Sequence, residues 1–288
     1  MRKLLLATLA LFPMSAAQAN PDVTSREYKL MLLTSAFSYN TEAANVDSFL
    51  DTAESTIEAA ISRTVTGSDY LATSRDLKFY DTAGSCVLDH SGYAFRERIE
   101  NGSSEVTLKF RSPDRYISDF EDLSSTSSQA ETKLEEDIGA SASSFFKSVY
   151  SHSTTAPNTR TINKMDDINI PFPGFGDDYG FSDSLDLVAV GGLTLRERVY
   201  KGRTIDLGDF DGAISVTLWY NGAPSGAVHP LAAEVSFKYE DSSADYTKSV
   251  VNRAKTAFAA LQTLTAWVDP DSDTKTRFVY NYNPSFCY

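Results

Sequence analysis

Cysteine, histidine and long apolar runs are all scarce in this chain. Its 288 residues include two cysteines and three histidines, and the histidines are too dispersed to indicate a zinc motif. The longest strongly apolar run, Leu4 to Phe12, is far shorter than the roughly 20 residues needed to cross a bilayer. We therefore expect no zinc domain and no membrane span.

A basic excess is also missing, because 26 lysines and arginines face 39 aspartates and glutamates, for a net charge of -13. A negative field of this size disfavours nucleic acid and anionic membranes as partners at long range. Any site for an anion must then be a local cluster of basic side chains.

The N-terminus carries the order of features typical of an export signal. Arg2 and Lys3 precede the apolar run, and Ala17-Gln18-Ala19 supplies small residues before Asn20. The pattern predicts a signal peptide over residues 1–19 and a mature chain over 20–288, with no cysteine after the cleavage site to take a lipid. The expected location is periplasmic or extracellular.

The two cysteines, Cys86 and Cys287, both lie in the mature chain. In an oxidising compartment such a pair favours a disulfide, which would fix the C-terminal tail to the first half of the chain. A catalytic thiol is the alternative, but His90 and His152 lie in polar segments without a motif around them.

Alternating and helical periodicities predict an α+β fold. The stretch 20–37 places Tyr28, Leu30 and Leu32 on one strand face. Apolar stripes at spacings of three and four predict helices over about 44–65 and 250–264. Further strands are expected within 78–111, 185–200, 213–220, 231–240 and 274–282. The Ser/Thr-rich stretch 112–182 is expected to be an insertion with a polar helix around 127–150.

Two related pentapeptides suggest that the fold has two similar halves, each with strands and a helix. They are Phe95-Arg96-Glu97-Arg98-Ile99 and Leu195-Arg196-Glu197-Arg198-Val199. After the first one, Asn101-Gly102 predicts a two-residue hairpin turn. Such a turn fixes the register, so that Arg98 lies opposite Glu105 and Arg96 opposite Thr107.

One face of that hairpin is strongly basic. It holds Arg96, Arg98, Lys109 and Arg111 together with Glu105 and Thr107. The polar faces of other strands add Lys29, Arg196, Arg198, Lys238, Glu27 and Glu234. Two interpretations remain open. The face is solvated, or the sheet closes with its apolar side outward, so that these charges line an interior suited to a polyphosphate and a bridging divalent metal.

The order of several short motifs resembles the CYTH superfamily, the triphosphate tunnel metalloenzymes. The motifs, in chain order, are Ser25-Arg26-Glu27-Tyr28-Lys29, Tyr80-Asp81-Thr82, Gly92, Arg96 with Arg98, Thr107-Leu108-Lys109, and Glu234-Val235-Ser236-Phe237-Lys238. The resemblance implies a closed eight-stranded antiparallel β-barrel, or tunnel, flanked by helices, in a single domain over 20–288.

The same resemblance implies roles for individual side chains. The expected phosphate contacts are Lys29, Arg96, Arg98, Lys109, Arg196, Arg198 and Lys238, and the expected ligands for magnesium or manganese are Glu27 and Glu234. Ser25 and Ser236 replace two glutamates of the family pattern, and the strand Val216 to Tyr220 lacks the family's aspartate. A hydroxyl is a poor ligand for a hard divalent ion.

Three functions are consistent with these observations. The chain is an exported hydrolase of tripolyphosphate or a related phosphoanhydride that depends on magnesium or manganese, a non-catalytic protein that binds polyphosphate or another small polyanion, or a structural envelope protein with an unused tunnel. The missing carboxylates favour binding over hydrolysis.

Overall fold

The computed structural model describes residues 22–141, 144–269 and 273–288. The expected signal peptide, residues 1–19, lies outside this described part of the chain. Within it, no helix is both long enough and apolar enough to cross a membrane.

Ten strands form one sheet in the described residues. They are β1 (Ser25–Leu32), β2 (Val65–Asp81), β3 (Tyr93–Glu100), β4 (Ser103–Ser112), β5 (Glu131–Ser141), β6 (Ser144–Asn158), β7 (Val188–Ala189), β8 (Leu195–Asp206), β9 (Asp211–Asn221) and β10 (Ala232–Glu240).

Helices and helical turns lie around the sheet. They are η1 (Thr34–Ala36), η2 (Tyr39–Thr41), α1 (Glu42–Ile61), α2 (Val87–His90), α3 (Arg115–Phe120), α4 (Asp166–Asn169), α5 (Pro173–Tyr179), η3 (Val190–Gly192), α6 (Lys248–Leu261) and α7 (Lys275–Tyr282). The α+β class is therefore confirmed, with α1 and α6 close to the expected boundaries.

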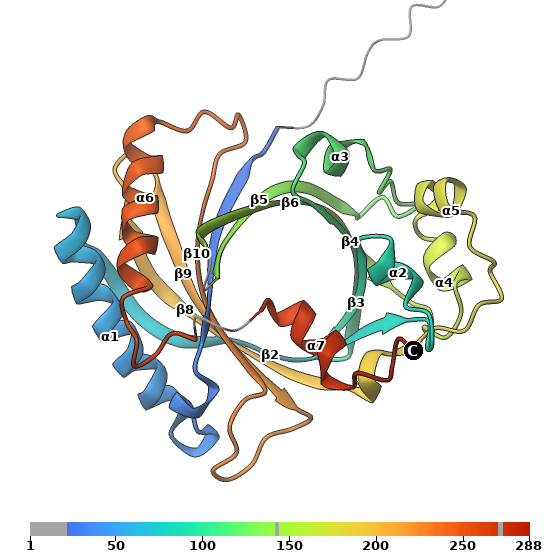
Figure 1. The fold of residues 1–288 in the computed structure, drawn as a ribbon, viewed down its shortest axis with the longest axis horizontal. Coiled ribbons are helices and arrows are strands. Elements are labelled where there is room, and N and C mark those ends of the chain that lie inside the picture. Colours follow the sequence, from blue (N-terminus) through green and yellow to red (C-terminus); the bar gives the residue numbers. More distant parts are fainter. Residues whose placement is uncertain (1–21, 142–143, 270–272) are drawn as a thin grey trace, which may run out of the picture.

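The sheet closes on itself as a ring (Figure 1). Its order is β3-β4-β6-β5-β1-β10-β9-β8-β2-β7, and β2 also pairs with β3, so nine strands complete the ring while the short β7 lies beside β2. The expected eight antiparallel strands are thus wrong in number. They are also wrong in direction at one junction, because β1 pairs with β5 in parallel.

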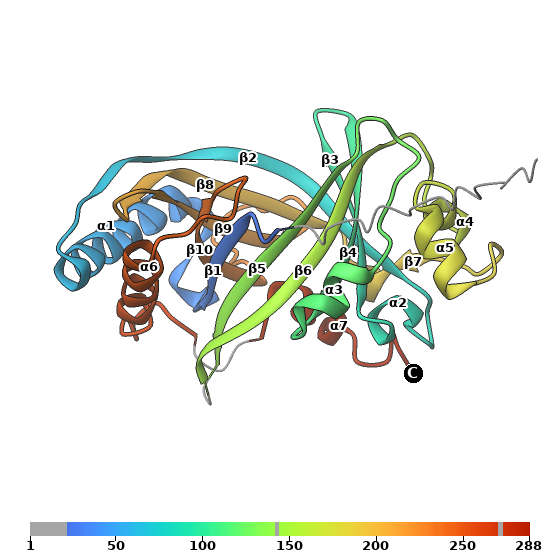
Figure 2. The same ribbon diagram turned by 90° about the horizontal axis from the view of Figure 1, so that it is seen from above.

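Alternation along the strands separates an apolar outer face from a polar inner face. Tyr28, Leu30 and Leu32 of β1 point outward into a core beneath α1 and α6, whereas Glu27 and Lys29 line the interior. Figure 2 shows these two helices side by side against the same part of the sheet. Helices α4 and α5 belong to a second apolar cluster on the outer face of β3 and β4.

The segment expected to be a polar helix around 127–150 is instead the hairpin of β5 and β6, which completes the ring between β4 and β1. Leu134 and Ile138 are both buried. A spacing of four residues brings two side chains to the same face of a helix and of a strand alike, so these apolar positions do not distinguish the two structures. The expectation of a polar helix around 127–150 is therefore wrong, whereas α3, α4 and α5 lie in the rest of the stretch 112–182.

The expected last strand over 274–282 is also wrong, because it is helix α7. The hydroxyl of Thr274 accepts a hydrogen bond from the backbone N–H of Arg277 and caps the helix. Val279 and Tyr280 pack against inward-facing apolar residues at one end of the ring. The aromatic residues of this segment favour a strand locally, but tertiary packing selects the helix.

The hairpin register and the disulfide agree with the sequence predictions. Arg98 lies opposite Glu105 and Arg96 opposite Thr107 in the β3–β4 pair. Asn101 and Gly102 both have positive φ, as a tight two-residue turn requires. Cys86 and Cys287 form a disulfide that joins the chain just after β2 to the C-terminal tail.

Candidate functional site

The ring encloses a charged cavity of about 860 Å³. Both arms of the β3–β4 hairpin contribute basic side chains to it, and β1, β5, β8 and β10 contribute carboxylates. Cavities of this size are typical of small-molecule sites. The outward side chains of β1, β3 and β4 are mostly apolar and pack beneath helices, so most charged side chains of these strands face the interior and not a solvated outer surface.

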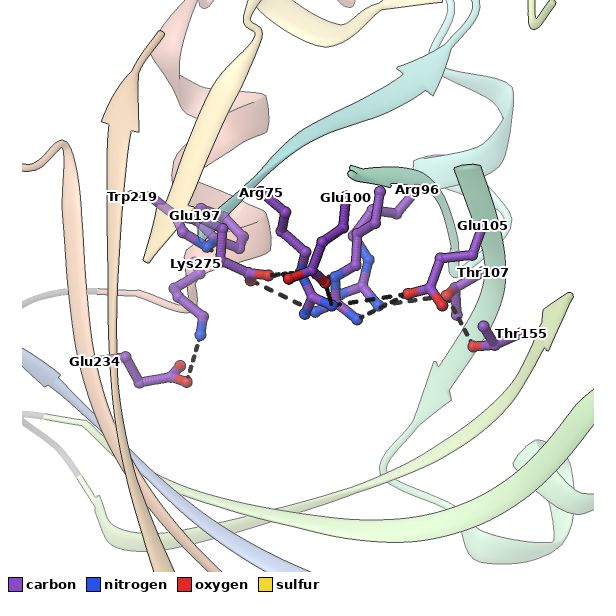
Figure 3. A network of polar contacts seen from close by, with 11 residues as sticks. Arg75, Arg96, Glu100, Glu105, Thr107, Thr155, Glu197, Trp219, Glu234 and Lys275 are labelled. Carbon is purple, nitrogen blue, oxygen red and sulfur yellow. Dashed lines mark hydrogen bonds and ion pairs between the residues drawn. The ribbon is translucent and has the colours of Figure 1, made fainter. Parts of the chain in front are cut away.

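The arginine cluster lies around Glu197 of β8, and Figure 3 shows two of its members, Arg75 of β2 and Arg96 of β3. The third member is Arg98 of β3. Arg75 Nε donates to Glu197 Oε2 at 2.6 Å, and Arg98 Nε lies 3.4 Å from the same oxygen. Trp219 Nε1 donates to the other oxygen at 3.1 Å. Burial opposes ionisation of Glu197, but the arginines hold its pKa well below the usual range.

Arg96 differs from its two neighbours because no carboxylate of the described residues lies within ion-pair distance of its guanidinium. Its one hydrogen bond is a long contact of 3.4 Å to Thr107 Oγ1, and its Nε is buried without a partner. Burial and the nearby Arg98 charge lower its pKa well below the ordinary value. The Arg96 side chain is only partly exposed, and a poorly solvated charge without a partner is unfavourable, so this position is suited to an incoming anion.

The lysine cluster is built around Asp137 of β5. Its carboxylate accepts from Lys29 Nζ at 2.8 Å, lies 3.4 Å from Lys109 Nζ, and accepts from Ser151 Oγ at 2.7 Å. Burial would raise the pKa of Asp137, but Lys109 and Lys29 keep it well below its usual range. Burial lowers the pKa of Lys109 to about 8, although Asp137 partly opposes this shift.

The two expected metal ligands are each paired with a lysine. Glu27 lies 2.9 Å from Lys29, and Glu234 lies 2.7 Å from Lys275 of α7. Magnesium and manganese need several oxygen ligands, of which carboxylates are the strongest. Within the described ranges, no three His, Cys, Asp or Glu side chains are grouped so as to hold a metal ion. The donor set therefore does not fit a divalent metal site.

The expected phosphate contacts divide between the two faces of the ring. Five of them, Lys29, Arg96, Arg98, Lys109 and Lys238, line the cavity. Arg196 and Arg198 point outward, so their expected place in the site is wrong. Arg196 pairs with Asp76 at 2.9 Å, and Arg198 donates to Glu42 at the start of α1 at 2.6 Å.

Arg196 and Arg198 point outward because of the register in which the two pentapeptides pair with opposite edges of β2. Leu77 of β2 lies opposite Arg98 on one side and opposite Leu195 on the other. These two residues are the fourth and the first of their pentapeptides, an odd offset of three positions. Because side chains alternate faces along a strand, the second repeat turns its glutamate, Glu197, inward and its arginines outward.

The interior residues that were not predicted as site residues include Arg75, Asp137, Glu197 and Lys275. Arg75 lies two residues before Leu77 and therefore points to the same, inward face of β2. Nothing in the sequence shows which face of β2 is interior. Asp137 continues the alternation of Glu131, Lys133 and Glu135, a signal for a strand that the helical interpretation concealed.

Comparison with known proteins gives matches only among solved structures. No protein-family model matches the chain, and no curated protein matches it. A candidate adenylyl cyclase from Hippeastrum, described as having a dominant triphosphatase activity, is 14% identical, with a TM-score of 0.42 over 90% of this chain and 95% of that one.

Two bacterial structures match to a similar extent. A candidate adenylate cyclase from Bacillus halodurans is 12% identical, with a TM-score of 0.40 over 90% of this chain and 97% of that one. Another from Vibrio parahaemolyticus is 11% identical, with a TM-score of 0.36 over 89% and 97%. The TM-scores of 0.36–0.42 are low, so the chemistry of this chain is derived from its own side chains.

Proposed function

We propose that this chain is an exported protein that binds a triphosphate or polyphosphate-type anion inside its ring and does not hydrolyse it with a divalent metal. The observation that carries this proposal is Arg96. Its guanidinium lies in the cavity beside Arg98, its Nε is buried without a partner, and no described carboxylate pairs with it. A phosphate oxygen would supply the missing acceptor.

Phosphate fits the rest of the interior as well. Arginine presents a planar fork of donors that matches phosphate oxygens, and lysine supplies a compact charge. The arginine cluster and the lysine cluster are contributed by neighbouring strands of one cavity. An anion with several phosphate groups would contact both clusters, whereas a single phosphate would contact one.

Binding is favoured over hydrolysis because of the carboxylates. Catalysis with magnesium or manganese needs several free carboxylate oxygens, and Glu27 and Glu234 are already ion-paired with Lys29 and Lys275. The serines at positions 25 and 236 supply hydroxyl groups where the family pattern has glutamates.

Isothermal titration calorimetry of the purified protein with sodium tripolyphosphate tests binding. We expect saturable heat with tripolyphosphate and weaker binding of orthophosphate, because a single phosphate reaches fewer donors. A thermal scan gives the second readout, since a ligand of the folded state raises the melting temperature. Absence of both heat and thermal shift at millimolar anion would refute the proposal.

Hydrolysis is tested separately by phosphate release from tripolyphosphate with magnesium and with manganese. We expect no release above a protein-free control. Release that disappears in a Glu27→Gln variant would establish the metal-dependent hydrolase instead. Release unchanged by this substitution would indicate a contaminating enzyme.

Export is supported by the N-terminal sequence and by the Cys86–Cys287 disulfide, which suits an oxidising compartment. Fractionation of cells that produce the protein, followed by measurement of the intact mass of the chain, tests export. A mature form beginning at Asn20 is expected outside the cytoplasm, and an uncleaved chain confined to the cytoplasm would contradict the proposal.

A further inference from the structure

Glu234 in the cavity is neutralised by a lysine that comes from the C-terminal helix. Lys275 is the first residue of α7, and its Nζ lies 2.7 Å from Glu234 Oε1 and 5.2 Å from the centre of the Trp219 ring (Figure 3). The Lys275 side chain is 17% exposed and that of Glu234 is 7% exposed. The ammonium group is thus held between a carboxylate and an aromatic face, two favourable partners for a cation.

The position of Lys275 is fixed by more than this ion pair. The Tyr280 hydroxyl donates to the buried carboxylate of Asp81 at 3.0 Å, and Val279 packs in the apolar cluster at that end of the ring. Beyond the helix, the Cys86–Cys287 disulfide joins the tail to the chain after β2. The fold therefore delivers the ammonium group of Lys275 to the cavity whether or not an anion is bound.

Glu27 is neutralised in a similar way by Lys29, which also contacts Asp137. Burial would raise the pKa of Glu27, but Lys29 lowers it and keeps the carboxylate charged. An ammonium group cancels one negative charge and keeps hydrogen-bond donors for further acceptors. A carboxylate without such a partner would repel an anion entering the cavity.

We infer that Lys275 takes the place of a divalent cation beside Glu234, so that the interior binds its polyphosphate-type anion without a metal. This inference rests on the proposed function, because it concerns how the same cavity tolerates an anion next to its carboxylates. It identifies Lys275 as a specificity-determining residue contributed by a helix outside the motifs of the sequence resemblance.

The first test compares tripolyphosphate binding by the wild-type protein in EDTA and in magnesium, with the concentration of uncomplexed anion held equal. We expect the dissociation constants to agree within about twofold, less than about 0.5 kcal/mol. A tenfold gain in magnesium would refute the inference and leave the proposed function intact. No binding in either condition would refute the proposed function itself.

The second test removes the Lys275 ammonium group and asks whether magnesium can replace it beside Glu234. In Lys275→Gln, Glu234 loses its partner, so binding in EDTA should weaken by about tenfold or more, as expected for loss of one charge-assisted interaction. Magnesium should restore most of this loss. The double variant Glu234→Gln with Lys275→Gln should bind nearly as the wild type does in EDTA, because the repelling carboxylate is also gone.

Manganese without the anion is a control. It should leave the melting temperatures of the wild type and of Lys275→Gln unchanged, because one free carboxylate supplies too few ligands for a divalent ion. Lys248→Gln removes the same charge at an exposed position of α6 and should behave as the wild type in every assay. Lys275→Gln binding the anion as well as the wild type in EDTA would overturn the inference.

If Lys275→Gln does not fold, Glu234→Gln replaces it as the informative variant, since it keeps the lysine. We expect its anion binding to be at least as tight as that of the wild type and still independent of magnesium. Weaker binding in Glu234→Gln would show that this carboxylate assists the anion and would overturn the inference.

Discussion

Arg96 and Arg196 occupy the same place in two related pentapeptides but lie on opposite faces of the ring. Substituting each by glutamine removes one positive charge from the same protein, so the two variants are matched in net charge. If the cavity binds the anion, Arg96→Gln should weaken binding strongly and Arg196→Gln should not. The comparison therefore separates a specific site from a general attraction between charges.

The magnitudes follow from the surroundings of each guanidinium. Arg96 lacks a described carboxylate partner and would donate to phosphate, and such a charge-assisted hydrogen bond contributes about 1.5–3 kcal/mol, or roughly 10- to 150-fold in the dissociation constant. Arg196 pairs with Asp76, and both side chains are about one-third exposed. An exposed pair of this kind contributes less than about 1 kcal/mol, and its loss should barely change anion binding.

Stability should change in the opposite sense to affinity. An uncompensated guanidinium in the cavity destabilises the unliganded protein, so Arg96→Gln should leave the free energy of unfolding unchanged or raise it by about 1 kcal/mol. Calorimetric titration at about 0.15 M salt, where the Debye length is about 8 Å, measures affinity, and urea unfolding measures stability. Equal losses of affinity in both variants would refute a site built around Arg96.

Three further predictions concern other contacts. At pH 8.5 the protein should take up a proton when it binds the anion. Burial lowers the pKa of Lys109 to about 8, so this amine is mostly neutral at pH 8.5, and a bound anion raises its pKa. Binding heats that are the same in buffers of different ionisation enthalpy would contradict this prediction. Removing the disulfide with Cys86→Ser should lower the free energy of unfolding by up to about 5 kcal/mol, since the bridge closes a loop of 201 residues, and reductant should then have no further effect. Glu42→Gln should cost about 3–5 kcal/mol in urea unfolding, because the buried Glu42 carboxylate accepts from Arg198 and two tyrosine hydroxyls; a loss below about 1 kcal/mol would contradict the network.

Sequence patterns predicted those parts of the fold whose geometry depends on residues close together in the chain. Alternation in β1 predicted that Tyr28 and Lys29 lie on opposite faces, and the two-residue turn at Asn101-Gly102 predicted which residues of β3 and β4 face each other. In both cases the deciding contacts lie within a few residues of one another. The alternation of apolar and polar residues and the residue types of the turn are therefore sufficient to predict these two features.

The inward and outward faces of β8 could not be predicted in this way. They depend on how β8 is registered against β2, more than a hundred residues earlier in the chain, and a shift of one residue exchanges the two faces. Arg196 and Arg96 occupy the same place in similar pentapeptides, but the odd offset in register between the repeats turns Arg196 to the outer face of the ring. Likewise, the aromatic residues of α7 favour a strand until packing against the end of the ring is known.

The motifs that matched the family pattern include Glu27 and Glu234, which both line the cavity, but they did not reveal what each carboxylate contacts. Position along a strand is a property of the local sequence, whereas the partner of a side chain depends on every segment that reaches the cavity. Lys275 reaches Glu234 from the first turn of the last helix, which Tyr280 and the disulfide hold in place. A carboxylate that a motif presents as a metal ligand is therefore, in this fold, half of an ion pair, and the chemistry of the cavity depends on the C-terminal helix as much as on the strands.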